Sequence, residues 1–154
     1  MDKKEGKIMK IGIASDHRGV KLKKEIIHYL EEQGHEVVNY GTNSTDSVDY
    51  PDYAFRLCDA VLDGTVERGI VICYTGIGMC MACNKVEGIR CAKVENREEA
   101  TMTRLHNDAN VMALRATMPE KTMKEIVDAF INTPFSNEER HLKRIAKLES
   151  HHAH

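Results

Sequence analysis

Short runs of β-branched residues alternate with segments of helical periodicity along most of this chain. Five strands are expected, with helices between them, at residues 8–14, 35–39, 69–74, 89–94 and 110–114. The run Gly-Ile-Val-Ile-Cys-Tyr at 69–74 is apolar throughout, which is typical of a central parallel strand covered on both faces. Regular β–α alternation with right-handed crossovers therefore predicts an α/β protein, a doubly wound, three-layer α/β/α sandwich.

The expected sheet has five parallel strands in the flavodoxin-like order 2-1-3-4-5, with a charged C-terminal helix from residue 137 to about 149. The length of 154 residues suits a single domain that covers residues 1–154, with flexible ends at 1–7 and 150–154. Its core is expected to include Met79, Met81, Met102, Met112, Met118 and Met123.

The composition excludes several classes of protein. The 22 basic and 24 acidic side chains give a formal net charge of −2, so no nucleic-acid partner is indicated. No apolar segment approaches the ~20 residues that span a membrane, and the charged N-terminus does not form a signal peptide. Five cysteines without an export signal are expected to stay reduced. We therefore expect a cytoplasmic protein without a membrane partner.

The loops that leave the first and third expected strands are unusual in composition. A doubly wound sheet binds its ligand outside the carboxyl ends of the strands, at the point where the strand order reverses. In the expected order that point lies between these two strands. The loops Ser15-Asp16-His17-Arg18-Gly19 and Tyr74-Thr75-Gly76-Ile77-Gly78-Met79 then face one crevice, which is the predicted site.

The groups around this crevice have structural as well as functional explanations. The glycines of Thr75–Gly78 can direct backbone N–H groups at an anion, or simply form a tight turn. Cys73 is either a small buried hydrophobe or a base whose pKa is lowered beside a helix N-terminus. Asp16 and His17 supply an acid and an imidazole, and Asp16 also suits the cap of the next helix. The two roles of Asp16 are compatible.

Other candidates lie outside the crevice. Arg140 and Arg144 are one helical turn apart and can converge on one phosphate, although a solvated charged face is the commoner cause of such spacing. His106 falls before the fifth strand, at the sheet edge opposite the crevice. If His106 is catalytic, it reaches the site of a neighbouring subunit; otherwise it closes a surface turn. The spacing of Cys80 and Cys83 suits a metal or redox site, but no second ligand pair follows, and a buried helix explains it.

Six segments together resemble the type B ribose-5-phosphate isomerases. They are Ser15–Gly19, Asp49–Pro51, Cys73–Met79, Asn84–Lys85, Arg104–Asn110 and Glu139–Arg144, in the family's order. The resemblance covers the chain from about Met9 to Leu148 and is far more specific than a glycine loop alone. It implies interconversion of D-ribose 5-phosphate and D-ribulose 5-phosphate through an enediolate, a step of the pentose phosphate pathway. It also implies no metal and no organic cofactor.

The same resemblance implies roles for the candidate residues. Cys73 matches the general base that carries a proton between carbons 2 and 1, and Thr75 and nearby backbone N–H groups match the oxyanion site. His106, working with Asp16, matches the group that opens the furanose ring. The substrate-binding residues implied are Tyr50, Gly76, Ile77, Gly78, Met79 and Asn107, with His17, Arg140 and Arg144 as phosphate binders.

Two positions depart from the family pattern. Tyr74 stands where the family often has glycine, and Thr117 stands where it uses an arginine against phosphate. Arg115 is the only nearby candidate to replace that arginine. It lies two positions before Thr117 in an extended segment, so both side chains are expected on one face.

The partner implied by the resemblance is a second copy of the chain, in a homodimer with shared active sites or in a dimer of dimers. Three alternatives stay open. They are an isomerase of a six-carbon aldose phosphate such as allose 6-phosphate or galactose 6-phosphate, a phosphate- or flavin-binding module, and a thiol sensor built on Cys73, Cys80 and Cys83. The two alternatives that are not enzymes leave His106 and the arginine pair unexplained.

Overall fold

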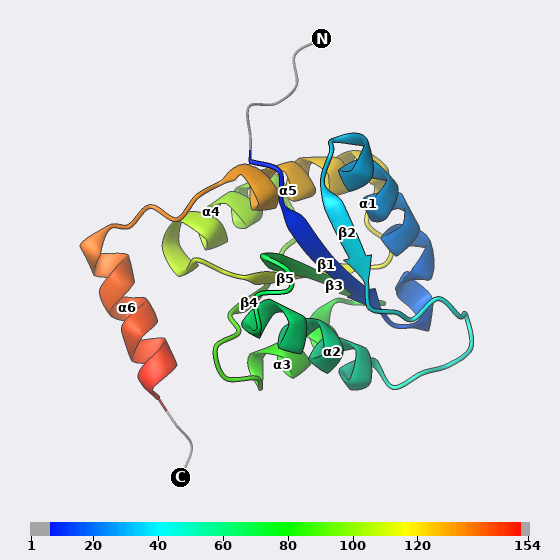
Figure 1. Cartoon of the computed structure of the whole chain (residues 1–154), viewed down its shortest axis with the longest axis horizontal. Helices are drawn as coiled ribbons and strands as arrows, with labels where there is room; N and C mark the ends of the chain where they lie inside the picture. The colour runs from blue at the N-terminus through cyan, green and yellow to red at the C-terminus, as the bar shows by residue number, and fades with distance from the viewer. Residues whose placement is uncertain (1–6, 152–154) are drawn as a thin grey trace.

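The computed structural model describes residues 7–151 of the chain. Residues 1–6 and 152–154, which make up most of the ends expected to be flexible, lie outside the described residues. Five parallel strands form one sheet between two layers of helices (Figure 1). The predicted three-layer α/β/α architecture is confirmed.

The bounds of most elements lie within a few residues of those expected. The strands are β1 (Lys10–Ser15), β2 (Glu36–Asn39), β3 (Arg68–Cys73), β4 (Cys91–Lys93) and β5 (Val111–Arg115). The helices are α1 (Val20–Glu32), α2 (Tyr50–Leu62), α3 (Ile77–Asn84), α4 (Arg97–Asn107), α5 (Glu120–Asn132) and α6 (Glu139–Ser150). A short 3₁₀ helix, η1 (His17–Gly19), precedes α1.

The strand order is β2-β1-β3-β5-β4, so the expected order 2-1-3-4-5 is wrong for its last two strands. The first four residues of β5 are buried, and this strand lies in the interior of the sheet beside β3. The three residues of β4 are only half-buried and end in a lysine, which suits an edge strand. The reversal between β1 and β3 is unaffected, because both orders place these strands side by side.

Two hydrophobic clusters fill the spaces between the sheet and its helices. One lies against α1, α4 and α5, and the other lies against α2 and α3. Successive residues of β3 point to opposite clusters, so that Ile72 belongs to the first and Cys73 to the second. The side chain of Cys73 therefore faces the layer of α2 and α3. None of the helices within residues 7–151 is long and apolar enough to cross a membrane.

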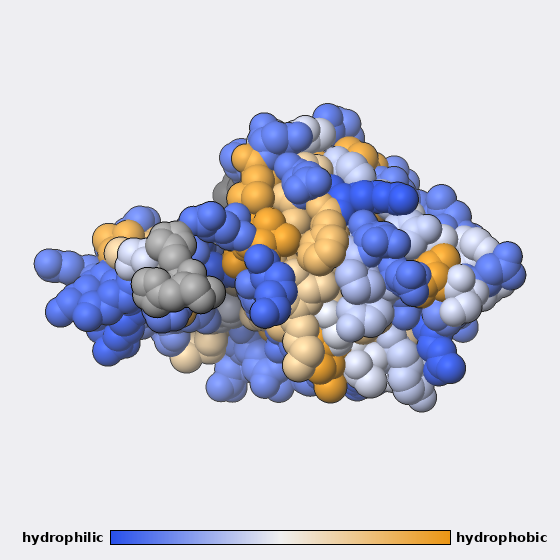
Figure 2. Space-filling model, turned by 90° about the horizontal axis from the view of Figure 1, so that it is seen from below, coloured by the Kyte–Doolittle hydropathy of each residue, from blue (hydrophilic) through white to orange (hydrophobic). Residues whose placement is uncertain are grey.

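The surface of α3 is more exposed than its composition predicts. Four of the expected core methionines are buried, namely Met79, Met112, Met118 and Met123. For Met81 of α3 and Met102 of α4 the prediction is wrong, since they are 66% and 43% exposed. Ile77 of α3 is also exposed, and Figure 2 shows a band of hydrophobic surface on this side of the molecule. An apolar helix normally has both sides covered, so one side of α3 lacks a cover in the single chain.

Helix α6 extends away from the rest of the molecule (Figure 1). Its residue His141 is buried, whereas Leu142 and Leu148 remain exposed. The helix is tied to the main body by contacts with α4 and by an ion pair of 2.6 Å between Arg90 and Glu149. An amphipathic helix with exposed leucines is typical of a segment that packs against another chain.

Candidate active site

The loop after β1 is a tight turn against the end of β3. The Asp16 side chain accepts hydrogen bonds from the backbone N–H groups of Arg18 and Gly19, both at 3.0 Å, so Asp16 caps η1 as expected. The backbone N–H of Asp16 donates to the carbonyl of Ile72 at 3.0 Å. A Cβ at Gly19 would lie 2.7 Å from Cγ2 of Ile72, so only glycine permits this close approach.

The loop after β3 leads directly into the N-terminus of α3. Cys73 ends the strand and is 5% exposed. Thr75 is exposed, and its Oγ1 accepts a hydrogen bond of 3.1 Å from the backbone N–H of Ile77. Gly76 has a φ of +80°, which favours glycine, and a Cβ there would lie 3.0 Å from the carbonyl carbon of Leu114. The positive end of the helix dipole at the start of α3 gives this loop an electrostatic preference for an anion.

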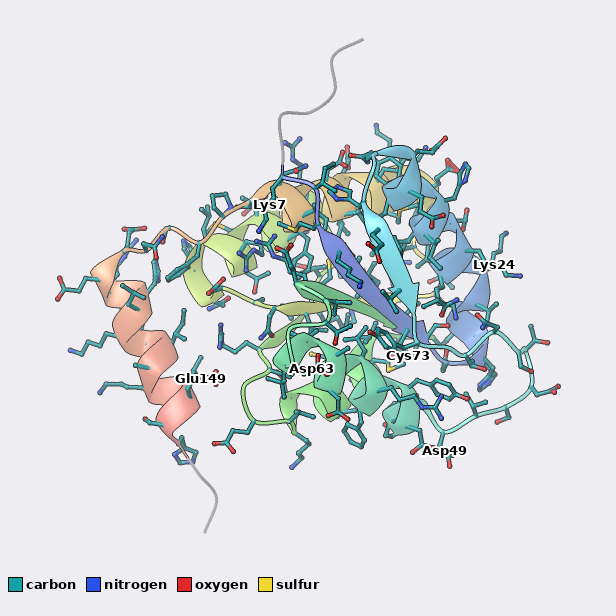
Figure 3. All side chains as sticks on the ribbon, viewed as in Figure 1. Lys7, Lys24, Asp49, Asp63, Cys73 and Glu149 are labelled. Carbon is teal, nitrogen blue, oxygen red and sulfur yellow. The ribbon has the colours of Figure 1, made fainter. Side chains whose placement is uncertain are left out.

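The two loops meet at one edge of the sheet. Because β1 and β3 are adjacent and parallel, with Ser15 opposite Ile72, their carboxyl ends point the same way. Figure 3 shows Cys73 where these two strands end. The Arg18 guanidinium lies over the Tyr74 ring, 4.7 Å from its centroid, in a cation–π contact between the loops. The structure thus brings together the expected residues of both loops.

Tyr50 joins this edge of the sheet from α2. The helix begins at Tyr50 with Pro51 in its first turn, as expected for a proline at that position. The Tyr50 ring packs so closely on the glycine loop that a Cβ at Gly78 would lie 2.7 Å from Cζ of the ring. Tyr50 is 37% exposed and therefore presents part of its surface beside the loop.

Lys23 is a positioning residue that the motifs did not indicate. This side chain of α1 is fully buried, and its ammonium donates hydrogen bonds to Asn39 Oδ1 at 3.0 Å, to Asn43 Oδ1 at 2.9 Å and to the carbonyl of Thr42. Three oxygen acceptors compensate the charge for its loss of water. A sequence signal exists, because Lys23 occupies a place on the stripe otherwise formed by Ile26, Ile27 and Leu30.

The loop that Lys23 holds also supports the predicted site. The backbone of Gly41 and Thr42 pairs with Ser15 at the end of β1, in hydrogen bonds of 2.7 and 2.8 Å. Farther along the loop, the N–H of Val48 donates to Nδ1 of His17 at 3.3 Å. His17, a predicted phosphate binder, is therefore oriented by the same loop.

His106 and the two C-terminal arginines lie elsewhere in the molecule. His106 is in the last turn of α4, before β5, which confirms its expected place opposite the crevice. Its ring stacks on that of His141, with a centroid distance of 4.3 Å and an interplanar angle of 20°. Burial lowers the pKa of His141, and His106 lowers it further. Arg140 and Arg144 are exposed on α6, which Figure 3 places across the molecule from Cys73.

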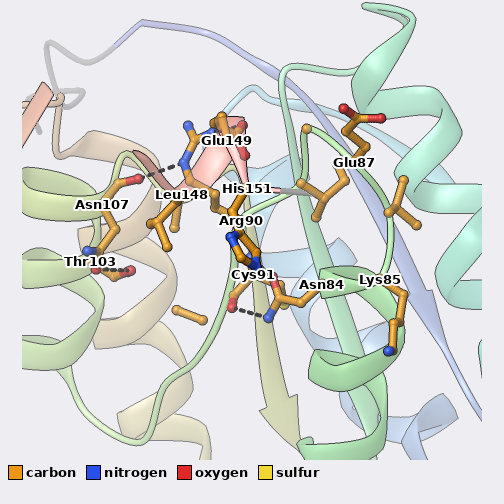
Figure 4. Close-up of a pocket in the computed structure, with 15 residues that line it drawn as sticks. Asn84, Lys85, Glu87, Arg90, Cys91, Thr103, Asn107, Leu148, Glu149 and His151 are labelled. Atoms are coloured by element: carbon orange, nitrogen blue, oxygen red, sulfur yellow. Dashed lines mark hydrogen bonds and ion pairs between the residues drawn. The ribbon is translucent and has the colours of Figure 1, made fainter. Parts of the chain in front are cut away.

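A groove of about 730 Å³ lies between α6 and the edge strand β4 (Figure 4). Arg90 crosses it, with Nε donating to the carbonyl of Asn107 at 2.9 Å and Nη1 bonded to Glu149. Asn107 is the one expected site residue among those that line the groove. This groove is therefore separate from the edge that carries Cys73.

The guanidinium of Arg115 reaches the position of Thr117. Its Nη1 donates to Thr117 Oγ1 at 2.9 Å, and its Nε donates to Glu95 at 2.7 Å. Burial by itself raises the pKa of Glu95, but hydrogen bonds from Lys93 and Arg115 outweigh that effect and lower it. Arg115 thus places positive charge beside Thr117, in a network with the Glu95 carboxylate.

Comparison with known proteins decides the family. A family model described as Ribose/Galactose Isomerase matches residues 11–148. The chain belongs to this family. It is 40% identical over 140 residues to the ribose-5-phosphate isomerase B of Escherichia coli (strain K12), with 90% of this chain and 93% of that protein covered.

Solved structures of the isomerase family share the fold. The ribose-5-phosphate isomerase B of Clostridium thermocellum matches with a TM-score of 0.89 and 45% identity, covering 92% of this chain and 95% of that one. The enzyme of Mycoplasma genitalium with bound ribulose-5-phosphate matches with a TM-score of 0.86 and 40% identity, covering 91% and 93%. The resemblance based on the six sequence segments is confirmed.

In this member of the isomerase family, replacing Lys23 by methionine keeps the apolar stem but removes three hydrogen bonds. We expect the loop of residues 39–48 to open more often, because a hydrogen bond to a charged group contributes about 1.5–3 kcal/mol. Hydrogen–deuterium exchange followed by mass spectrometry is then faster in that segment. Lys24→Met, at an exposed neighbouring position, is the control. Equal exchange in both variants would contradict the role given to Lys23.

Proposed function

We propose that this chain is an aldose–ketose isomerase that interconverts D-ribose 5-phosphate and D-ribulose 5-phosphate. The observation that carries the proposal is the position of Cys73 beside Thr75 and the glycine loop, at the N-terminus of α3. The names of the similar proteins support the same substrate class. Isomerisation moves one proton and oxidises one carbon while reducing its neighbour, so it needs a base and an anion site but no external electron carrier.

The site suits this chemistry in three respects. A thiolate of Cys73 takes the proton from carbon 2 of the aldose and returns it to carbon 1. The enediolate oxygen, which gains negative charge, is stabilised by Thr75 and the N–H groups at the start of α3. The other sulfur-containing side chain of this loop, that of Met79, is fully buried, and a thioether does not accept a proton at neutral pH. Cys73 is therefore the base that the loop offers. Tyr50 and His17 lie around the same edge as substrate contacts, and Asp16 lies there to assist ring opening.

The active unit in this proposal is a homodimer. His106, Asn107, Arg140 and Arg144 lie away from the Cys73 of their own chain, so a second copy has to supply ring opening and phosphate binding. Exposed Ile77 and Met81 on α3, and exposed leucines on α6, provide apolar surface for such a contact. A cytoplasmic location suits the five free thiols.

The decisive experiment compares five- and six-carbon substrates. A coupled assay with EDTA measures kcat/KM for ribose 5-phosphate, allose 6-phosphate and galactose 6-phosphate. We expect ribose 5-phosphate to be favoured by about tenfold or more, because an additional carbon displaces either the phosphate or the reacting carbons. A higher kcat/KM for a six-carbon substrate would overturn the substrate assignment. Absence of turnover together with flavin absorbance would indicate a binding module instead.

Cys73→Ala tests the proposed base. We expect kcat to fall by ~100-fold or more, while substrate affinity and thermal stability change little, because the thiol acts on a proton rather than on binding. Cys58→Ala is a matched control, since Cys58 lies in the same hydrophobic cluster but away from the loop. Near-normal kcat in Cys73→Ala would eliminate Cys73 as the base.

Mixing two inactive variants tests the shared site. Cys73→Ala and His106→Ala are each expected to be inactive, but their hybrid dimer contains one site with both groups intact. After subunit exchange at equal amounts, we expect about one quarter of the wild-type activity, because half of the dimers are hybrids with one working site. Each variant incubated alone is the control. Absence of recovery, with exchange verified by mass spectrometry, would show that His106 serves its own chain.

Arg115→Ala tests whether this guanidinium replaces the arginine missing at Thr117. We expect KM for ribose 5-phosphate to rise several-fold with little change in kcat, as for the loss of a uniform binding contact. Arg140→Ala is the comparison variant. An unchanged KM in Arg115→Ala, beside a large rise in Arg140→Ala, would assign phosphate binding to α6 and His17 without Arg115.

A further inference from the structure

Four of the five cysteines form a cluster behind the proposed site. Cys58 of α2 and Cys83 of α3 are fully buried, whereas Cys80 of α3 and Cys91 of β4 are half-buried. Cys58 and Cys83 belong to one hydrophobic cluster, and Cys80 and Cys91 pack against it. Within residues 7–151, no group of three or more His, Cys, Asp or Glu side chains is arranged to hold a metal ion. The chemistry of this cluster is therefore that of the thiols themselves.

Cys80 and Cys91 are held together by the surrounding backbone. Asn84 lies one turn after Cys80 on α3, and its side chain forms two hydrogen bonds with the backbone of Cys91, at 2.8 and 2.9 Å. The thiol of Cys80 lies 3.5 Å from the carbonyl oxygen of Cys91. These contacts hold the backbone of Cys91 against the face of α3 that carries Cys80. A disulfide needs such an approach without backbone movement.

The cysteine spacing on α3 suggests a different pair from the one that the structure favours. Cys80 and Cys83 are three residues apart on the helix, but the contacts of Cys83 run to Cys58 and Cys91. Cys58 and Cys83 are each 0% exposed, so an oxidant in solution does not reach them in the folded chain. Cys80 and Cys91 are thus the accessible pair of the cluster.

Cys80 is the more reactive of these two thiols. A hydrogen bond from Cys91 lowers the pKa of Cys80 to about 7, assisted by the nearby Lys93, so a large fraction of Cys80 is thiolate at neutral pH. The pKa of Cys91 is raised by the contacts with Cys80 and Cys83. Cys91 and Asn84 also line the groove of about 730 Å³ beside β4 (Figure 4). A small solute in this groove is next to Cys91, whereas Cys80 reaches solvent as a half-buried residue of α3.

We propose that Cys80 and Cys91 form an oxidation site, at which hydrogen peroxide converts the two thiols into a reversible intrachain disulfide. The Cys80 thiolate attacks one peroxide oxygen; the O–O bond breaks, hydroxide leaves, and Cys80 becomes a sulfenic acid. The Cys91 thiol gives its proton to hydroxide, and its sulfur then attacks the Cys80 sulfur. The S–S bond forms and the S–O bond breaks, so that two thiols lose two electrons and the peroxide is reduced to water and hydroxide.

The disulfide acts on the helix that begins at the glycine loop. The backbone N–H of Cys80 donates to the carbonyl of Gly76 at 3.1 Å in the first turn of α3. A covalent bond from Cys80 to Cys91 therefore ties this turn to the edge strand β4. Cys73, on a different element, takes no part in the reaction.

The test uses the full chain and a covalent readout. The protein is treated with one equivalent of hydrogen peroxide at pH 7, the remaining thiols are alkylated, and tryptic peptides are analysed by mass spectrometry. Cleavage after Lys85 and Arg90 separates Cys91 from Cys80 and Cys83, and fragmentation assigns the linked sulfur. We expect a Cys80–Cys91 link that dithiothreitol removes. Because no turnover is measured, the outcome is independent of the proposed isomerase activity.

Two variants sharpen the assignment. Cys91→Ser removes the partner thiol and should leave a sulfenic acid on Cys80 that dimedone traps. Cys58→Ser, the matched control from the buried end of the cluster, should keep the Cys80–Cys91 link. A link between any other pair, a link between two chains, or no link while Cys73 is oxidised would each overturn the proposal.

Discussion

The pairing of β1 with β3 is the contact on which the site depends. These strands are neighbours within the sheet, and the chain continues from β1 to β2 at one edge and from β3 to β4 at the other edge. Helices leaving them therefore cover opposite faces, so that the loops at their carboxyl ends do not compete for the same space. The approach is close enough that Gly19 contacts Ile72 and that Asp16 bonds to the backbone of β3. Asp16, Cys73 and the glycine loop meet because two strands pair.

The same arrangement limits what one chain can achieve. In a parallel sheet all strands start at the same end of the sheet and finish at the opposite end. A residue before β5 therefore lies far from one that follows β3. His106 comes before β5, and Cys73 ends β3. No loop rearrangement within such a sheet unites the two edges. A dimer in which the edges of two chains meet removes this restriction, and the uncovered sides of α3 and α6 are available for it.

Local pattern predicted the layers, the loops at the crevice and the cap at Asp16, because each follows from residues that are close in sequence. The order of β4 and β5 was wrong, because their expected runs at 89–94 and 110–114 are similar in length and composition. Which of them takes the interior place depends on burial against distant helices. The role of Lys23 could not be predicted for a related reason, since its partners Asn39 and Asn43 lie 16 and 20 residues away in the sequence. Met81 is exposed because no other part of the described chain covers that side of α3. The periodicity of a sequence does not predict whether another element covers a helix face.

The eight residues of α3 connect the features of this molecule. The first turn begins at the glycine loop and directs the positive end of the helix dipole at the proposed anion site. The inner side carries Met79 and Cys83 into the core, and the outer side leaves Met81 uncovered. The side toward β4 carries Cys80 and Asn84. A short helix that packs on three sides has little freedom to shift independently, because interiors are close-packed. The β4 side of α3 and the glycine loop at its first turn are therefore parts of one packed element.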